Sequence, residues 1–176
     1  MRELALHILD IIENATRAGA TQINFSAELD KDKEWLSLCI ADNGSGLPVT
    51  PEQALDPFYT TKTGKRTGLG LSLFKAATEQ ANGTFHLGTA PAGGALVRAT
   101  FQFHHVDRMP LGDLAETFLA VLISSPEVHF HCSIVGPQGA FSLHSQELDK
   151  HLSQFKKARL FANQLQEALC AVGIEE

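Results

Sequence analysis

The chain has little that would place it in a membrane or in a disulfide framework. Its 176 residues include three cysteines, Cys39, Cys132 and Cys170, which are odd in number and widely spaced. This spacing indicates neither a set of disulfides nor a cysteine-rich metal cluster. No stretch approaches about 18 consecutive apolar residues, and the sequence does not open with a basic segment, an apolar run and a cleavage site. We therefore expect a soluble, cytoplasmic protein that makes no use of a membrane.

Positive charge is also scarce. Lys and Arg number 14 against 20 Asp and Glu, which gives a net charge of −6. Because affinity for duplex nucleic acid rests on clustered basic side chains, we expect no general nucleic-acid binding. The chain has no internal repeats, and 44% of its residues are hydrophobic, enough to bury a core. A chain of this length forms one domain with an appendage or two small domains.

The first feature of note is a glycine-containing loop, Asp42-Asn43-Gly44-Ser45-Gly46, which ends a strand of alternating apolar residues. Gly44 and Gly46 have no Cβ atom, so a ligand can approach the backbone there. The carboxylate of Asp42 stands beside this opening and can accept a hydrogen bond from an amino group. On its own, such a loop also serves as an ordinary turn.

A second loop reads Gly68-Leu69-Gly70-Leu71 and opens a helix after a basic run that contains Lys62, Lys65 and Arg66. The free backbone N–H groups and the positive dipole end of a helix attract phosphate. Together, the two loops indicate a site for a purine and its phosphates far more strongly than either loop alone.

A third element lies upstream, on an apolar-faced helix near the start of the chain. Asp10 and Asn14 are four residues apart and therefore share one side of that helix. The carboxylate can take a proton from water, and the amide oxygen can bind a hard cation. Alone, the pair would fit a solvated polar stripe. Beside the two glycine loops it predicts the metal-facing side of a nucleotide site.

These three elements, in this order and spacing, resemble the GHKL family of ATP-binding domains over residues 1–104. That family includes gyrase B subunits, mismatch-repair MutL proteins, anti-sigma serine kinases and sensor histidine kinases. The resemblance implies ATP and Mg²⁺ as cofactors, with Asn14 as the magnesium-binding asparagine. It also implies that Asp42 accepts a hydrogen bond from the adenine amino group, and that Gly44 and Gly46 shape the adenine pocket.

The resemblance extends to the phosphate end of the site. It implies that Gly68, Leu69, Gly70 and Leu71 start the helix beneath the phosphates. The segment that ends at Lys62 is similar to the entry of the lid in this family, which makes Lys62 a candidate phosphate contact.

Two departures from the family pattern bear on chemistry. Hydrolysing members carry a glutamate four residues before the asparagine, where this chain has Asp10, one methylene shorter; Glu13 is a second candidate base. A threonine that often helps to bind adenine is replaced by Ala95, so adenine contacts are expected to be fewer or mediated by water.

The fold class expected is α/β, a mixed sheet with helices on one face in the Bergerat-type ATP-binding arrangement. Residues 1–105 are expected to form the ATP-binding domain, and residues 106–176 a helix–hairpin–helix extension. The expected helices lie near 2–18, 48–56, 69–82, 111–125 and 146–171, and the expected strands near 21–29, 35–42, 84–90, 95–104, 127–135 and 140–145.

The expected function is ATP binding coupled to hydrolysis or to transfer of the γ-phosphate to a partner protein, in regulation or signalling. Because the helix that carries Asp10 begins near residue 2, a phospho-acceptor histidine is expected on another chain. Two alternatives remain: a non-catalytic nucleotide-sensing adaptor, and an anti-sigma-like protein that sequesters a regulator. For the extension we expect either packing on the ATPase sheet, a homodimer surface, or a module that recognises a protein partner.

Overall fold

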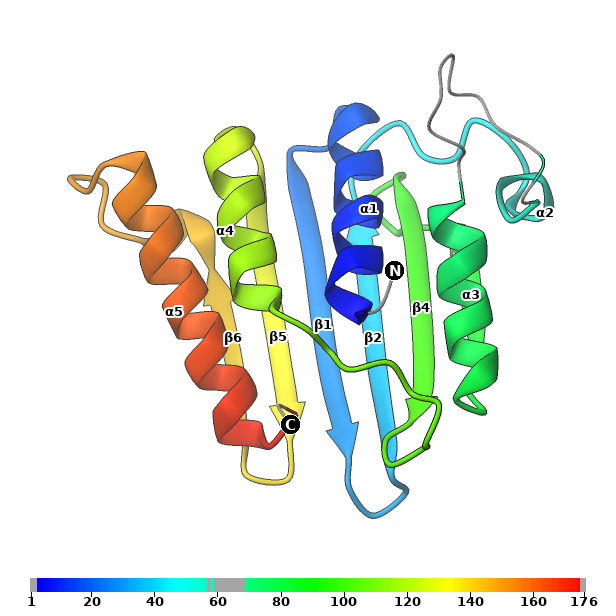
Figure 1. Ribbon diagram of the computed structural model, residues 1–176. Helices are drawn as coiled ribbons and strands as arrows, with labels where there is room; N and C mark the ends of the chain where they lie inside the picture. Colours follow the sequence, from blue (N-terminus) through cyan, green and yellow to red (C-terminus); the bar gives the residue numbers. More distant parts are fainter. Residues whose placement is uncertain (1–2, 57, 59–68, 175–176) are drawn as a thin grey trace.

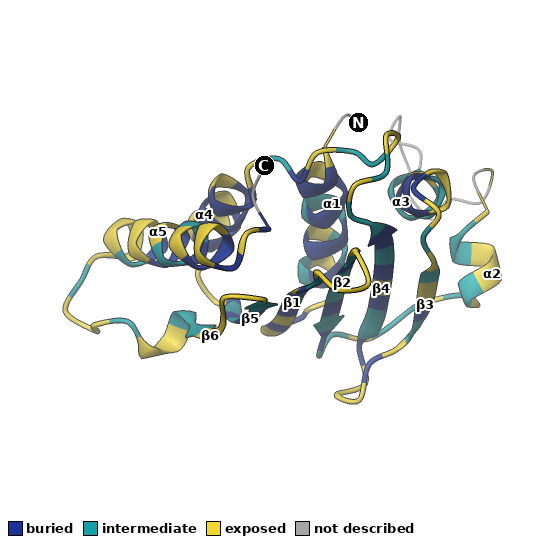
Figure 2. Cartoon of the chain, turned by 90° about the horizontal axis from the view of Figure 1, so that it is seen from below, coloured by how far each residue is buried: buried dark blue, intermediate teal, exposed yellow. Residues whose placement is uncertain are grey.

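The computed structural model describes residues 3–56, 58 and 69–174, which form one mixed six-stranded sheet with helices packed on one face (Figure 1). Seen along the sheet, the longer helices all lie on the same side of it (Figure 2). The predicted α/β class and the one-sided cover of helices are thus confirmed. The strands, in the spatial order β3-β4-β2-β1-β5-β6, are β1 (Gln22–Asp30), β2 (Trp35–Asp42), β3 (Phe85–Thr89), β4 (Ala95–Gln102), β5 (His129–Gly136) and β6 (Gly139–His144). The helices are α1 (Leu4–Arg17), α2 (Pro51–Ala54), α3 (Gly70–Gln80), α4 (Leu114–Ser124) and α5 (Gln154–Val172).

Alternation along the strands explains why only one face is covered. In β2, Leu36, Leu38 and Ile40 are buried beneath the helices, while the residues between them are only half-buried. Successive side chains of a strand point to opposite faces, so the large apolar residues meet the helices and the small residues between them form the other face. On α1 the buried residues follow the helical spacing that the sequence indicates, with Ile8 and Ile12 at the centre.

The strand register brings several segments to one end of the sheet. β1 and β2 are antiparallel with Ile23 opposite Asp42, so the start of β1 lies beside the end of β2. β5 runs parallel to β1 with His129 opposite Gln22, so β5 starts at this same end. The C-terminal end of α1 also lies there (Figure 1).

The segment after residue 105 continues the sheet and its core. β5 pairs with β1 over seven residues, from Gln22 and His129 onward. Phe118 of α4 is fully buried, and its ring packs edge-on against Phe25 of β1 at 5.2 Å and Phe130 of β5 at 4.8 Å between ring centroids. Residues on both sides of position 105 therefore share one sheet and one hydrophobic core.

The last helix differs from the prediction in where it begins. The sequence pattern predicts a helix from residue 146, whereas α5 starts at Gln154. Residues Ser145–Glu147 instead form a short 3₁₀ turn, and the Ser145 hydroxyl accepts a hydrogen bond from the backbone N–H of Phe130 at 2.9 Å. Ser153 then caps α5 by accepting a hydrogen bond from the N–H of Lys156. A side-chain bond to β5 and a better cap thus outweigh helix propensity over residues 146–153.

No helix in the described ranges is long and apolar enough to cross a membrane.

Candidate nucleotide-binding site

A cavity of about 410 Å³ opens between α1, the end of β2, the loop that follows it and α3. Its volume lies within the usual range for small-molecule sites. Five of the residues expected from the sequence to take part in the site line it, namely Asp10, Asn14, Asp42, Gly46 and Leu71. The remaining lining residues are Ile11, Ala15, Arg17, Ala18, Ser45, Leu47, Pro48, Val49, Ala54, Leu87, Ala95 and Val97. The fold therefore brings together residues from the three separate sequence elements.

Asp42 is the buried anchor of this cavity, with 4% of its surface exposed. Its Oδ1 accepts a hydrogen bond from the N–H of Gly44 at 2.7 Å, and its Oδ2 accepts one from the N–H of Ala95 at 3.2 Å. Two backbone donors thus fix the orientation of the carboxylate. Each carboxylate oxygen can accept a further bond, so Asp42 can still receive an amino group of a ligand.

The glycines beside Asp42 are required by close approaches. Gly46 has a φ of +77°, a conformation that strains any residue with a Cβ atom. A Cβ atom on Gly44 would lie 2.9 Å from the carbonyl oxygen of Ala18 and 3.0 Å from Oδ1 of Asp42. Gly44 is not among the residues that line the cavity. Its lack of a side chain lets the loop pack closely against Asp42 and the end of α1.

Asp10 and Asn14 meet on α1 as their spacing predicts. The Nδ2 of Asn14 donates to Oδ2 of Asp10 over 3.4 Å, and both side chains face the cavity. Glu13, the second candidate base, is exposed and is not among the lining residues. The geometry thus favours Asp10 over Glu13 as the acidic group of the site.

Arg17 is a lining residue that the sequence reasoning missed. Its Nη2 donates to Oδ1 of Asn14 at 2.5 Å. The signal was available, because a basic residue three positions after Asn14 lies on the same side of a helix. Arg17 brings a fixed positive charge to the part of the cavity where phosphates are expected.

The oxygen atoms on α1 suit a magnesium ion that is held mainly by its ligand. Mg²⁺ usually keeps several waters and takes one or two protein oxygens together with substrate phosphates. Asn14 offers such an oxygen, provided that Arg17 releases it. Within the described residues no group of three or more His, Cys, Asp or Glu side chains could hold a metal. The donor set therefore fits Mg²⁺ bound with a phosphate ligand, rather than a protein-only metal site.

The start of α3 packs directly against Asp10. A Cβ atom on Gly70 would lie 1.7 Å from Oδ2 of Asp10, so this carboxylate occupies the space over Gly70. Leu69 stands at the N-cap, and its side chain makes no hydrogen bond to the first N–H groups of α3. Lys62 and Gly68, the other two expected phosphate contacts, lie outside the described residues.

A buried histidine lies behind the site. His7 is 1% exposed and stacks on Phe74 of α3, with ring centroids 5.2 Å apart and planes at 14°. Within the described part of the chain, neither of its ring nitrogens has a hydrogen-bond partner. Burial lowers the pKa of His7 below its ordinary value, although the Gly70 backbone and Asp10 act in the opposite direction. Burial thus favours the neutral form of the His7 ring, which lies one turn from Asp10 on α1.

Comparison with known proteins agrees with this geometry. The chain is 30% identical over 106 residues to the sensor histidine kinase YxdK of Bacillus subtilis, an alignment that covers 56% of this chain and 32% of that protein. It is 31% identical over 97 residues to the sensor protein KdpD of Escherichia coli, covering 53% of this chain and 11% of KdpD. The chain thus spans a third or less of the length of these relatives.

Among solved structures, the N-terminal domain of a DNA repair protein shares the fold with a TM-score of 0.53 at 15% identity. The superposition covers 89% of this chain and 56% of the other, so the likeness reaches past residue 105. The family model of histidine kinase-, DNA gyrase B- and HSP90-like ATPases matches residues 2–105, more than half of the chain. The chain belongs to the histidine kinase-, DNA gyrase B- and HSP90-like ATPase family and contains a histidine-kinase-like ATP-binding domain.

Proposed function

We propose that this protein binds ATP with Mg²⁺ in the 410 Å³ cavity and hydrolyses it, with Asp10 as the general base. The observation that carries the proposal is the convergence of Asp10, Asn14 and Asp42 on one cavity. Asp10 suits the proton transfer, Asn14 the metal and Asp42 the recognition of adenine.

Adenine recognition would rest on Asp42. Its buried carboxylate, already fixed by the N–H groups of Gly44 and Ala95, would accept a hydrogen bond from the adenine amino group. Leu87 and Val97 line the same cavity and would pack against the ring. A buried acceptor of this kind discriminates strongly, because a base without the amino group leaves the carboxylate unpaired.

The phosphates would lie between α1 and the start of α3. Asn14 would hold Mg²⁺ through Oδ1, and Arg17 would turn from that oxygen to a phosphate oxygen. When bound, the ion would neutralise phosphate charge and help to orient the phosphates. The first N–H groups of α3 would contribute further positive potential.

Hydrolysis would use Asp10 as the proton acceptor. As the oxygen of a water molecule bonds to the γ-phosphorus, the bond from that phosphorus to the bridging oxygen breaks, which gives ADP and phosphate. A carboxylate oxygen of Asp10 would take the proton that the water loses. The short side chain places this oxygen against Gly70, at the start of the helix that would face the phosphates.

The second candidate is transfer of the γ-phosphate to a side chain of a partner protein. It is supported by the matched relative YxdK, which is a sensor histidine kinase by name. In this case the partner supplies the nucleophile, and Asp10 is not needed to activate water.

A single-turnover reaction with γ-labelled ATP and Mg²⁺ tests the proposal. We expect the wild type to release labelled phosphate, and Asp10→Asn to bind ATP but release at least about 100-fold less, the low end of the usual contribution of a general base. Glu13→Gln is the matched control, because this exposed residue of the same helix lies outside the cavity. ATP binding without phosphate release by the wild type would exclude hydrolysis and leave transfer to a partner or nucleotide sensing.

A further inference from the structure

A second cavity, of about 370 Å³, lies in the part of the chain that follows residue 105. It is enclosed by the end of α4, the start of β5, the turn after β6 and the first turns of α5. Its lining residues are Leu122, Pro126, Val128, His129, Ser145, Gln146, Leu148, Lys150, Gln154, Lys157 and Ala158. None of the nucleotide-site residues takes part in it.

The charge of this cavity is of one sign. Lys150 and Lys157 both line it, and no acidic side chain does. Among the described residues, neither lysine forms an ion pair, although the chain carries a net charge of −6. The nearest acid in sequence, Asp149, turns its Oδ1 to the backbone N–H of His151 at 2.9 Å. Two cations thus face one cavity without a partner for their charge.

One part of the cavity wall is apolar. Leu122, Val128 and Ala158 are buried, and Leu148 is half-buried. The Nε2 of Gln154 donates a hydrogen bond to the carbonyl oxygen of Leu122 at 2.8 Å, which joins α5 to the end of α4. An apolar wall with a few charged groups at the rim is the common form of a small-molecule site. It suits a ligand that has an anionic head and an apolar body.

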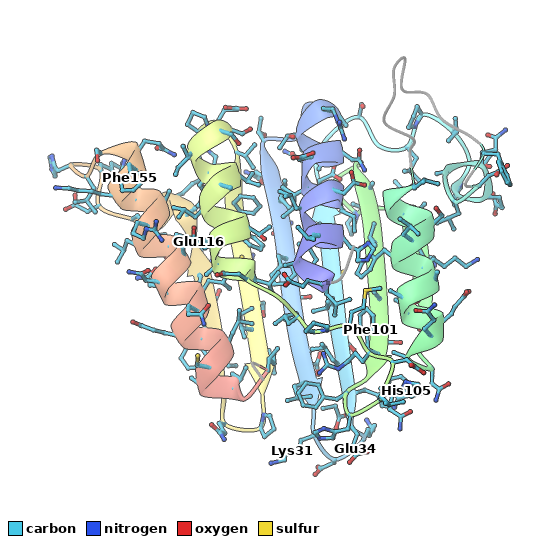
Figure 3. The ribbon with its side chains drawn as sticks, viewed as in Figure 1. Lys31, Glu34, Phe101, His105, Glu116 and Phe155 are labelled. Atoms are coloured by element: carbon cyan, nitrogen blue, oxygen red, sulfur yellow. The ribbon has the colours of Figure 1, made fainter. Side chains whose placement is uncertain are left out.

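The position of the cavity is also informative. It lies at the end of the sheet that carries the nucleotide cavity, because His129 opposes Gln22 and Ile23 opposes Asp42. Figure 3 shows Phe155, at the start of α5, at this end of the molecule, while Lys31 and Glu34 in the β1–β2 turn lie at the opposite end. The two cavities thus lie at the same end of the sheet, with β1 between them.

We propose that this second cavity binds a small anionic molecule, a phosphate monoester or a carboxylate with an apolar body, held by Lys150 and Lys157. A lysine ammonium is a point charge that pairs with either head group. The apolar wall would bury the body of the ligand and favour it over a bare inorganic anion. This site does not depend on the proposed hydrolysis of ATP.

The test is a titration of the isotope-labelled chain, followed by NMR, with four probes: phenyl phosphate, phenylacetate, inorganic phosphate and benzyl alcohol. We expect at least one of the two aromatic anions to give saturable shifts at His129 and at the amides of residues 153–158. Neutralising either lysine, as Lys150→Gln or Lys157→Gln, should weaken this affinity at least about fivefold, since hydrogen bonds to charged groups contribute more than about 1 kcal/mol. Lys156→Gln is the matched control, because Lys156 immediately precedes Lys157 on α5 and does not line the cavity.

The comparison of phenyl phosphate with phenylacetate identifies the preferred head group. The proposal is overturned if neither aromatic anion gives saturable shifts at these residues, or if Lys156→Gln weakens binding as much as Lys157→Gln. It is also overturned if benzyl alcohol binds as tightly as the anions, because charge then plays no part. Equal affinity for inorganic phosphate and phenyl phosphate would contradict the role given to the apolar wall.

Discussion

The carboxylate of Asp10 occupies the space that a side chain at Gly70 would need. A Cβ atom built on Gly70 would lie 1.7 Å from Oδ2 and 2.6 Å from Cγ of Asp10. The two residues belong to different helices, α1 and α3, whose sequence elements are 60 residues apart. Because Gly70 has no side chain, the carboxylate of Asp10 can pack directly against the start of α3.

From this contact we predict that Gly70→Ala displaces Asp10 and lowers both thermal stability and phosphate release. Alanine is about 1 kcal/mol better than glycine inside a helix, so local propensity alone would stabilise the variant. Overpacking of a tight contact costs about 1–3 kcal/mol, which reverses that sign. Gly88→Ala is the control, because its closest neighbour is the end of the His86 side chain rather than a site residue. A Gly70→Ala variant with unchanged melting temperature and turnover would contradict the contact.

Arg17 is expected to act on phosphates. Arg17→Gln should weaken ATP binding by about tenfold, as expected for the loss of a charge-assisted hydrogen bond worth about 1.5 kcal/mol, and should have less effect on adenosine. A nucleotide-affinity series of ATP, ADP and adenosine measures this difference. The exposed Arg98 of β4 provides the control variant Arg98→Gln. Equal losses for ATP and adenosine in Arg17→Gln would show that Arg17 supports the fold rather than the phosphates.

The buried ring of His7 predicts a loss of stability at acidic pH. Its pKa in the folded chain lies below the ordinary value, so the unfolded chain binds a proton more readily. The free energy of unfolding should therefore fall as pH drops below about 6.5, and level off below the folded pKa. Urea unfolding of His7→Phe should show a smaller fall over this window than the wild type. His131, whose pKa is also lowered by burial and by His144, keeps part of the dependence.

His86 offers the comparison for that experiment, since it is exposed on β3. His86→Gln should retain the acid dependence of the wild type. An unchanged pH profile in His7→Phe would mean that the buried ring is not the group responsible.

We further predict that the chain unfolds as one unit, despite the expected division at residue 105. Phe118 of α4 packs on Phe25 of β1, so buried aromatic rings from the segments before and after residue 105 are in direct contact. Phe118→Ala should cost about 3–5 kcal/mol, a large part of the stability of a domain. The unfolding transition followed by Trp35 fluorescence, which reports on β2, should coincide with the transition followed by helical circular dichroism, both in the wild type and in Phe118→Ala. Two separate transitions, with only one of them shifted by Phe118→Ala, would assign two independent domains.

Much of the fold and of the site could be predicted from local patterns. Alternation in β2 and the spacing of Asp10 and Asn14 are short-range signals. The structure shows the alternating burial and the contact between the two side chains that these signals predict. The parallel pairing of β5 with β1 is a contact between segments about 100 residues apart, for which the chain carries no local mark. The start of α5 was missed because Ser145 bonds to Phe130, a tertiary contact that overrides propensity.

The most direct test of the account is a calorimetric titration of a non-hydrolysable ATP analogue with Mg²⁺ into the wild type, Asp42→Asn and Asp30→Asn. Asp30 is a half-buried residue that pairs with Lys33 at the other end of β1, far from the cavity, so its variant is the matched control. We predict 1:1 binding by the wild type and by Asp30→Asn, and affinity at least about tenfold weaker in Asp42→Asn, where an amide faces the adenine amino group. Equal affinity in all three proteins, or no binding by the wild type, would contradict the assignment of the cavity as an ATP site.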